Sequence, residues 1–558
     1  MTSSAPPRTS ALRRSDATPA DAVASATQSA NVSELRGAYL NVAIIGVFAA
    51  AVGVGLWRHE PWRDELQAWM IVRASRTPTA LVRNLRHEGH PIGWYAYLWL
   101  FAKLARGIWM LQFATWAASV ATATLIMFRA PWKRPTRILI IFGYFFFYEY
   151  SVLARGYNLG AFFTIAALVC LRPCVRWLPF GIATAALALT SAFGTIIALA
   201  LFIAVLVEQY ANLRDHETRS RATVAIATFG SFAFLGLIQA QPTASTASFN
   251  SWNFSVDAHL ASTAIAAVFR GLIPLPQFRH SWWNTSIGDG HTGIAAVIAI
   301  IAFIAIAYQL RRSRAAVVVW LLSNTMIVSI LYLKLRQADA ARYYGHTVLA
   351  LIASLWLLSS VPGNGQTDPH QPTDAADTME TGDVDRDVTR KHKHKQIATT
   401  PWWFVAILAL QCAMGFTTFA IDIAQPFTDA QATADWLRAH TTSSTPLIGC
   451  GDAAVSSVAG HLDRPIYFRQ GTRTDTFVRW NLARMTEFTT LERAIATVRR
   501  PGSPQVLYIS NQPIPSLARE ERFSAHTGIV GDEHYWIYDV GALTEQELRE
   551  LQDPCRKP

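Results

Sequence analysis

The sequence of 558 residues predicts an α-helical polytopic membrane protein with a small C-terminal α/β domain outside the membrane. Hydrophobic residues make up 51% of the chain. Charged residues make up only 16%, against roughly 25% in soluble proteins. Long apolar stretches separate the charged clusters, and about eleven of them approach the length that a membrane span needs. This composition excludes a string of soluble domains and a wholly disordered chain.

Residues 1–37 are rich in Ser, Thr, Ala and Pro, and this composition predicts a disordered cytoplasmic tail. The apolar stretch 38–57 is too long for the core of a signal peptide, so it predicts the first membrane span. A tight hairpin is expected at 190–194, inside one long apolar run. The other candidate spans are 108–128, 138–153, 157–172, 178–190, 191–209, 222–241, 294–310, 315–333, 347–361 and 401–421.

The positions of Lys and Arg predict the orientation in the plasma membrane, because basic loops stay on the cytoplasmic side. The N-terminus and the basic loops share that side only if the segment between 58 and 129 crosses once. The stretch 92–106 is therefore expected to be interfacial or re-entrant, within an external loop 57–107. The basic loops are 129–137, 172–176, 214–221 and 311–314.

The C-terminal part of the sequence has a different composition. Residues 362–400 carry acids followed by a Lys/His run and predict a disordered cytoplasmic linker. After the span 401–421, residues 422–558 have an ordinary soluble composition and are expected outside the membrane. Short strands and helices predict a small α/β domain there. The expected strands are 446–450, 465–468, 505–510 and 535–540, and the expected helices are 429–440 and 486–499.

Two acids, Asp64 and Glu65, stand directly after the first span. They lie near the start of a predicted helix whose apolar stripe suits the surface of a bilayer. Acids also favour the first turn of a helix because of its dipole, so a purely structural interpretation stays open. A second short helix is expected to begin at Pro78, with Thr77 as its N-cap, and to end at Gly89. The stripe consists of Trp62, Leu66, Trp69 and Met70.

Two further charged clusters are predicted on the external side. The first contains Glu149, Arg155 and Tyr157, and an ion pair between Glu149 and Arg155 is a structural alternative to a functional site. The second breaks the usual charge bias of the outer side. Because guanidinium groups match phosphate oxygens, these cations suit an anionic lipid-linked substrate. The second cluster comprises Lys334, Arg336, Arg342 and Tyr343.

The order of these features resembles the GT-C glycosyltransferases, especially the protein O-mannosyltransferase and aminoarabinose-transferase-like group, glycosyltransferase family 39. The shared order is a span, an external Asp-Glu, an amphipathic helix, His90-Pro91, an aromatic apolar stretch and then Arg155-x-Tyr157. The resemblance covers about residues 38–360. The sequence departs from the family at Ile92, where a second proline is usual.

The resemblance implies a polyprenyl-phosphate sugar as donor and an acidic catalytic base, which maps onto Asp64 with Glu65 as its neighbour. It assigns the donor phosphate to Arg155 and Tyr157, with Arg336 and Arg342 as further candidates. A single displacement would invert the anomeric centre. The acceptor is expected to be an envelope protein, lipid or glycan. Further substrate contacts are assigned to His90, Glu149 and Tyr343.

No cofactor and no nucleic-acid partner are expected, although an Asp64–Glu65 pair could hold a divalent metal. The aromatic loop 242–293 suits either a sugar-stacking lid or an interfacial belt. A multi-span transporter or lipid flippase is the rival function. Such a protein would more often carry paired repeats with broken helices. A non-catalytic envelope scaffold is a third alternative.

Overall fold

The computed structural model describes residues 19–241, 252, 254–335, 340–359, 400–499 and 505–551, with side chains from residue 35 onward. The chain divides into two compact units, Met1–Val47 and Phe48–Pro558. The first helix, α1 (Pro19–Arg58), belongs partly to each. Part of the expected disordered tail 1–37 is therefore helical, whereas residues 1–18 and residues 362–399 of the expected linker 362–400 lie outside the described residues.

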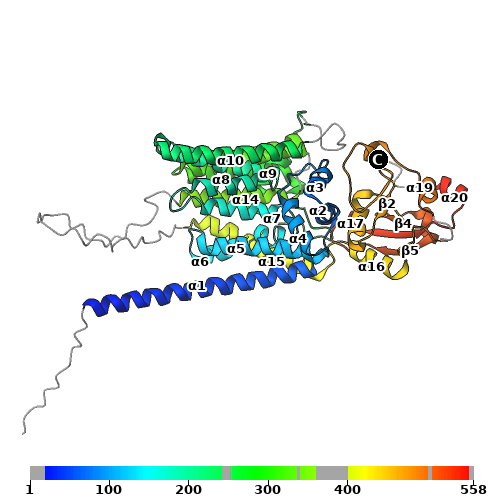
Figure 1. Cartoon of the computed structure of the whole chain (residues 1–558), viewed down its shortest axis with the longest axis horizontal. Coiled ribbons are helices and arrows are strands. Elements are labelled where there is room, and N and C mark those ends of the chain that lie inside the picture. The colour runs from blue at the N-terminus through cyan, green and yellow to red at the C-terminus, as the bar shows by residue number, and fades with distance from the viewer. Residues whose placement is uncertain are drawn as a thin grey trace, which may run out of the picture. The chain divides into compact units, whose positions relative to one another are not determined.

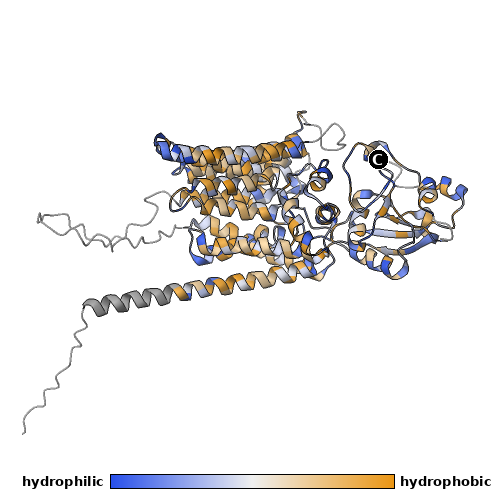
Figure 2. Cartoon of the chain, in the orientation of Figure 1, coloured by the Kyte–Doolittle hydropathy of each residue, from blue (hydrophilic) through white to orange (hydrophobic). Residues whose placement is uncertain are grey.

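The fold class is confirmed: the chain is mostly helical, and seven described helices are long and apolar enough to cross a membrane. Figure 2 shows apolar residues over most of the surface of these helices. Three further apolar helices are shorter: α7 (Tyr157–Val169), α8 (Trp177–Ala188) and α11 (Ala258–Leu272). The seven are the Leu35–Arg58 part of α1, α5 (Ile108–Arg129), α9 (Ala192–Gln209), α10 (His216–Ala240), Asp289–Leu310 with η3 (Asp289–His291) and α12 (Thr292–Leu310), Arg314–Leu335 with α13 (Arg314–Ile330) and η4 (Leu331–Leu335), and α15 (Trp402–Ala424).

Several predicted spans differ from the helices that form. The stretch 138–153 is split between α6 (Arg134–Ile141) and a π-helical turn, η1 (Phe145–Glu149). The expected span 347–361 begins earlier, as α14 (Ala341–Leu358). The hairpin at 190–194 is confirmed, because α8 ends at Ala188 and Ser191 caps α9 by accepting a hydrogen bond from the Gly194 amide.

The bundle is held by close helix pairs. Helix α8 packs on α10, α9 packs on α13, and α13 packs on α14, and Figure 1 shows α8, α9, α10 and α14 side by side. Small residues permit the α8–α10 approach, since a Cβ added at Gly181 would meet the backbone of Ala225 at 2.9 Å. Such small-residue contacts are typical of helix pairs in membranes. The short turn η2 (Asn212–Arg214) joins α9 to α10.

The segment after α1 forms three short helices, α2 (Arg63–Ala74), α3 (Pro78–Asn84) and α4 (Gly93–Leu104). Thr77 caps α3 as predicted, accepting a hydrogen bond from the Ala80 amide at 3.1 Å. The helix ends at Asn84, before the expected Gly89. Helix α4 has 12 residues, fewer than the roughly 20 that a crossing needs.

The apolar stripe of α2 does not face a bilayer, and that prediction is wrong. Its four residues are each at most 4% exposed. They are covered by α4 and by α17 (Asp452–Leu462) of the C-terminal domain, where Gly460 allows close packing against Leu66. An amphipathic pattern indicates only that one face is buried, and here the covering surface is protein.

The C-terminal α/β domain is confirmed as a six-stranded mixed sheet in the order β3-β2-β1-β4-β6-β5. Strand β1 pairs in parallel with β2 and β4, and the outer pairings are antiparallel. Separate apolar clusters involve α16 with α17 and α19 with α20. Strands β3 and β5 and helix α17 were not predicted from the sequence. The elements are α16 (Ala430–His440), β1 (Leu447–Gly449), β2 (Ile466–Phe468), β3 (Arg473–Asp475), α18 (Ala483–Thr486), α19 (Leu491–Val498), β4 (Leu507–Ser510), η5 (Pro515–Glu520), β5 (Glu521–Ala525), β6 (Tyr535–Asp539) and α20 (Glu545–Glu550).

Candidate active site

Asp64, in the first turn of α2, lies among three guanidinium groups. Its Oδ2 is 2.5 Å from Nη1 of Arg155 and 3.6 Å from Nη2 of Arg342. Its Oδ1 is 4.0 Å from Nε of Arg63. The Asp64 side chain remains 29% exposed. The structure therefore brings together three segments that are far apart in the sequence: α2, the loop before α7, and the first turn of α14.

The charges at this site are unbalanced. Burial raises the pKa of Asp64, but Arg155, followed by Arg342 and Arg63, outweighs burial and lowers the pKa to about 2. Burial conversely lowers the pKa of Arg155, and Asp64 more than restores it. Arg63 also pairs with Asp532 at 2.5 Å, so at neutral pH the Asp64 carboxylate faces two otherwise unbalanced guanidinium groups, those of Arg155 and Arg342, and this excess of positive charge suits an anionic ligand.

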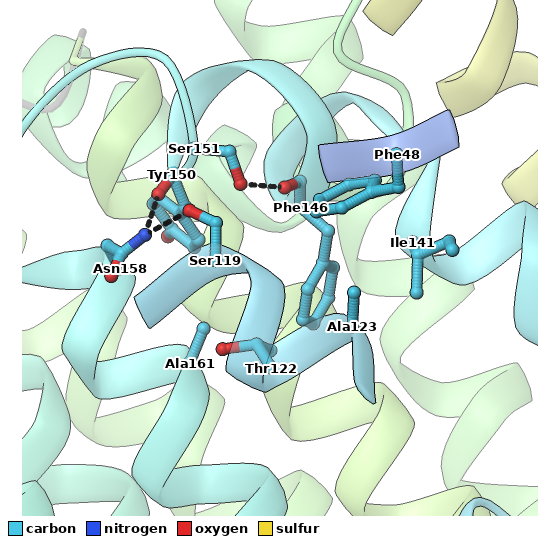
Figure 3. Close-up of a pocket in the computed structure, with 10 residues that line it drawn as sticks. All are labelled: Phe48, Ser119, Thr122, Ala123, Ile141, Phe146, Tyr150, Ser151, Asn158 and Ala161. Atoms are coloured by element: carbon cyan, nitrogen blue, oxygen red, sulfur yellow. Dashed lines mark hydrogen bonds between the residues drawn. The ribbon is translucent and has the colours of Figure 1, made fainter. Parts of the chain in front are cut away.

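The loop that carries Arg155 is held by Asn158, near the start of α7. The Asn158 amide donates hydrogen bonds to the carbonyl oxygen of Tyr150 and to Oγ of Ser119, both at 2.6 Å. Figure 3 shows this amide between the two acceptors, beside a small internal cavity. The cavity measures about 10 Å³, close to the space that one water molecule requires. Buried hydrogen bonds of this kind fix the loop and therefore the position of Arg155.

Arg342 is fixed by its backbone and by aromatic rings. Its carbonyl oxygen accepts a hydrogen bond of 2.9 Å from the hydroxyl of Tyr150. Its guanidinium carbon lies 5.0 Å from the ring centre of Tyr343, 5.7 Å from that of Trp62 and 6.0 Å from that of Trp283. Cation–π contacts stabilise a charge that has lost part of its water.

Glu65 points away from Asp64 and is fully buried. Its Oε2 accepts hydrogen bonds from Nε2 of His59 at 3.0 Å and from the Trp62 amide at 3.1 Å, and its Oε1 accepts one from the Ala154 amide. His59 also contacts Oδ2 of Asp422 through Nδ1, at 2.9 Å. Both oxygens of Glu65 are therefore occupied by partners that connect α2 to α1, α15 and the Arg155 loop.

Glu149 does not pair with Arg155, so the ion pair considered as a structural alternative does not form. Arg155 binds Asp64 instead. Glu149 is 1% exposed, and its Oε2 accepts hydrogen bonds from the hydroxyl of Tyr144 at 3.0 Å and from Nε1 of Trp283 at 3.4 Å. It thus lies one residue, Trp283, away from the guanidinium of Arg342.

Of the other predicted residues, Tyr157, Tyr343 and His90 are considered first, and Lys334 and Arg336 follow. Tyr157 lies 5.9 Å from the guanidinium of Arg155 and 6.3 Å, ring centre to ring centre, from Tyr343. Burial and the nearby Arg155 lower the pKa of His90 to about 4, so it is neutral at physiological pH. Lys334 lies against the ring of Trp252, at 5.4 Å. Arg336 lies outside the described residues.

Glu88 was not predicted as a site residue, whereas Trp282 and Trp283 belong to the aromatic loop 242–293, for which a sugar-stacking lid and an interfacial belt were both considered. Glu88 is 7% exposed and accepts hydrogen bonds from Gln67 at 2.8 Å and from the hydroxyl of Tyr95 at 3.4 Å. Burial raises its pKa to about 7. Its position two residues before His90 was the only feature of the sequence that could have indicated Glu88 as a site residue. Trp283 packs on Trp62, at 4.7 Å between ring centres, so part of the aromatic loop belongs to the interior of the site.

Asp64 and Glu65 are not arranged as a joint metal site, since their carboxylates contact different partners. Within the described ranges, no group of three or more His, Cys, Asp or Glu side chains lies in a position to hold a metal ion.

Taken together, the fold and the site define a helical multi-span membrane protein with a cationic site around one carboxylate. No protein-family model matches the chain, and no curated protein matches it. Among solved structures, the chain is similar to the crystal structure of ArnT from Cupriavidus metallidurans bound to undecaprenyl phosphate. The sequence identity is 12%, the match covers 89% of this chain and 97% of that chain, and the TM-score is 0.38.

Proposed function

We propose that this protein is an inverting glycosyltransferase of the GT-C type. It moves a sugar from a polyprenyl-phosphate donor to an acceptor of the cell envelope, on the outer face of the plasma membrane. The observation that carries the proposal is the contact of Asp64 with Arg155 and Arg342 at 2.5 and 3.6 Å. A carboxylate beside paired guanidinium groups supplies both a proton acceptor and an anion site.

The guanidinium groups of Arg155 and Arg342 bind the donor phosphate. In a polyprenyl-phosphate sugar this phosphate is a diester with one negative charge, and it becomes a monoester with a second charge as the sugar leaves. Guanidinium groups fixed in place stabilise the second charge more than the first, and such differential binding accelerates the reaction. Tyr157 and Tyr343 lie beside the two arginines, and Arg336 is a further candidate.

Asp64 accepts the proton of the acceptor hydroxyl. The acceptor oxygen forms a bond to the anomeric carbon, the bond from that carbon to the phosphate oxygen breaks, and the proton passes to the carboxylate. With its pKa held near 2, Asp64 is a weak base while it pairs with Arg155. A bound phosphate shares the guanidinium groups, so the pKa of Asp64 rises when the donor is present.

The remaining assigned residues support these two roles. Glu65 positions α2, because both of its oxygens are occupied by neighbouring groups. His90 lies near enough for Arg155 to lower its pKa, and as a neutral ring it contacts the substrate. Glu149 orients Trp283 beside Arg342. The basic loops favour a cytoplasmic N-terminus and a C-terminal domain on the outer side.

The proposal is tested with the full-length protein in lipid nanodiscs. The protein is incubated with labelled polyprenyl-phosphate mannose, arabinose or aminoarabinose and with an envelope fraction. A glycosyltransferase gives a labelled acceptor and releases polyprenyl phosphate in equal amounts. A transporter or flippase moves the lipid between leaflets of a vesicle without forming product. Lipid movement with no product from any of these donors would reject the proposal.

A further inference from the structure

A second site lies where the helical bundle meets the C-terminal domain. It is an open cleft of about 570 Å³, within the range typical of ligand sites, which often form at domain junctions. One wall consists of residues 57–61 with the start of α5. The other consists of residues 422–426 and of α16 side chains. Asp64, Arg155 and Arg342 are not among the residues that line it.

The charged groups of this cleft are mutually balanced. His59 pairs with Asp422, and Arg438 pairs with Asp435. Arg58 donates a hydrogen bond of 3.3 Å to the carbonyl oxygen of Ile423. With Glu60 included, the lining holds three cationic side chains (Arg58, His59 and Arg438) and three carboxyl groups (Glu60, Asp422 and Asp435), so it carries no surplus of charge that would select a strongly anionic or cationic ligand.

Several hydrogen-bonding groups of the cleft are unused. Oε2 of Glu60 is buried without a hydrogen-bond partner. The side-chain amides of Gln425 and Gln431 form no hydrogen bond with any described residue, whereas the Gln112 amide donates one to the carbonyl oxygen of Leu56. Carboxylate and amide groups complement hydroxyls, which both donate and accept hydrogen bonds. At the rim, Trp57 is 78% exposed and offers a flat apolar face.

We propose that this cleft binds an uncharged oligosaccharide, at a site separate from Asp64. Balanced walls with unused amides and a carboxyl match a ligand that carries many hydroxyls and no charge. Such a site would retain a glycan at the membrane surface beside the catalytic site. Binding at this cleft does not require the transfer reaction, so this inference is tested independently of the proposed function.

The test measures binding of mannotriose, arabinotriose and cellotriose by saturation-transfer NMR. The full-length protein is held in nanodiscs, because a maltoside detergent would itself present a disaccharide to the cleft. We expect saturation transfer to at least one trisaccharide. Gln431→Trp fills the cleft from an exposed position and is expected to weaken binding about tenfold or more, a loss of roughly 1.4 kcal/mol or more.

Two controls keep the result specific. Gln546→Trp makes the same change on α20, away from the cleft, and Asp64→Asn removes the proposed catalytic base; both are expected to leave binding unchanged. Circular dichroism and thermal unfolding verify that Gln431→Trp remains folded. The inference is overturned if no trisaccharide receives saturation, or if Gln431→Trp binds as the unchanged protein does. Binding lost equally in Asp64→Asn would place the glycan at the catalytic site and would also overturn it.

Discussion

At the scale of single residues, Asp64 carries one negative charge beside the two guanidinium groups of Arg155 and Arg342, and this imbalance governs how the site responds to ligands. Any group that engages Arg155 or Arg342 weakens their hold on Asp64. The donor phosphate therefore has two effects: it neutralises the excess positive charge, and it makes the carboxylate a better base.

Removal of a guanidinium group should impair use of the donor. For Arg155→Ala we expect kcat/KM for the polyprenyl-phosphate sugar to fall about 100-fold, mostly through KM, because a charge-assisted contact to phosphate is lost. Arg342→Ala should lower it as well, because Arg342 supplies the second guanidinium group beside Asp64. Initial rates at varied donor concentration measure both. Arg221→Ala, an exposed position on α10, is the control, and unchanged donor saturation in Arg155→Ala would reject the phosphate role.

Glu88 should make stability depend on pH. Burial raises its pKa from 4.5 to about 7. Its contribution to stability is therefore present below pH 4.5 and is lost as the pH rises to about 7, a change of about 3 kcal/mol. We expect Glu88→Gln to reduce this loss when thermal unfolding is followed between pH 4.5 and 8. Glu217→Gln, at an exposed site, should behave like the unchanged protein. An unaltered pH profile in Glu88→Gln would contradict the assignment.

The residues that meet at the site could be predicted only in part. The topology predicted from the basic loops placed Asp64, Arg155 and Arg342 on one side of the membrane. Their direct contact could be found only in the folded structure. Lys334 shared the same prediction but lies on Trp252, because side-chain partners depend on packing that a charge pattern does not contain. Glu88 went unnoticed because a single buried acid in a short polar string has no periodic signature.

At the scale of elements, His59 connects three helices near their ends. It follows α1, contacts Glu65 of α2 and contacts Asp422 of α15. Burial lowers the pKa of His59, but Asp422, followed by Glu65, raises it to about 10. A protonated ring between two buried carboxylates thus holds the start of α2 against the bundle.

This connection should contribute stability at neutral pH. With a pKa raised from 6.5 to about 10, the contribution of His59 is fully present below pH 6.5 and is lost as the pH rises to about 10. We expect His59→Gln to lower the free energy of unfolding by about 3–5 kcal/mol at pH 6.5, because two buried carboxylates lose their partner. The variant should also lose less stability between pH 6.5 and 10. Unfolding in nanodiscs measures both.

His259→Gln makes the same change at an exposed position and should leave both stability and its pH dependence unaltered. A His59→Gln protein as stable as the unchanged chain at pH 6.5 would show that the contacts of His59 do not hold α2.

Long apolar helices and capped helix starts were predictable, because they follow from local sequence. The start of α3 at Pro78 and the α8–α9 hairpin are examples. The π-helical turn at Phe145–Glu149 was not predictable, since the hydropathy of an aromatic apolar run is the same as that of one continuous span. Helix α11 was missed because the aromatic residues around it suggested a loop.

At the scale of the whole molecule, the C-terminal domain braces the helix that carries Asp64. Arg63 lies 2.5 Å from Asp532, the Gln67 amide exchanges hydrogen bonds of 2.7 and 2.9 Å with the backbone of Val478, and Arg73 pairs with Asp463 at 2.7 Å. The position of Asp64 therefore depends on a domain that begins more than 350 residues later in the chain.

Disturbing this brace should lower transfer without altering the site itself. A Cβ added at Gly460 would already lie 3.1 Å from Leu66. We expect Gly460→Leu to displace α2 and to reduce kcat about tenfold or more, because small misplacements of catalytic groups are costly. Gly230→Leu is the matched control, since a Cβ added at Gly230 meets no atom within 4 Å. Equal transfer rates in the two variants would argue against the brace.

The two-part architecture was predictable from composition, but the covering of α2 by the C-terminal domain was not. An apolar stripe such as that of Trp62, Leu66, Trp69 and Met70 can pack equally well against lipid or against protein. Only the fold shows that α17 occupies that face.

The central claim is that Asp64 is the base for transfer from a lipid-phosphate donor. The most direct measurement is single-turnover transfer by Asp64→Asn in nanodiscs, with Asp215→Asn, an exposed helix cap, as the matched control. We predict that Asp64→Asn loses at least about 100-fold in rate. It should still bind polyprenyl phosphate, because the guanidinium groups remain. Transfer by Asp64→Asn at the rate of the unchanged protein would contradict the claim.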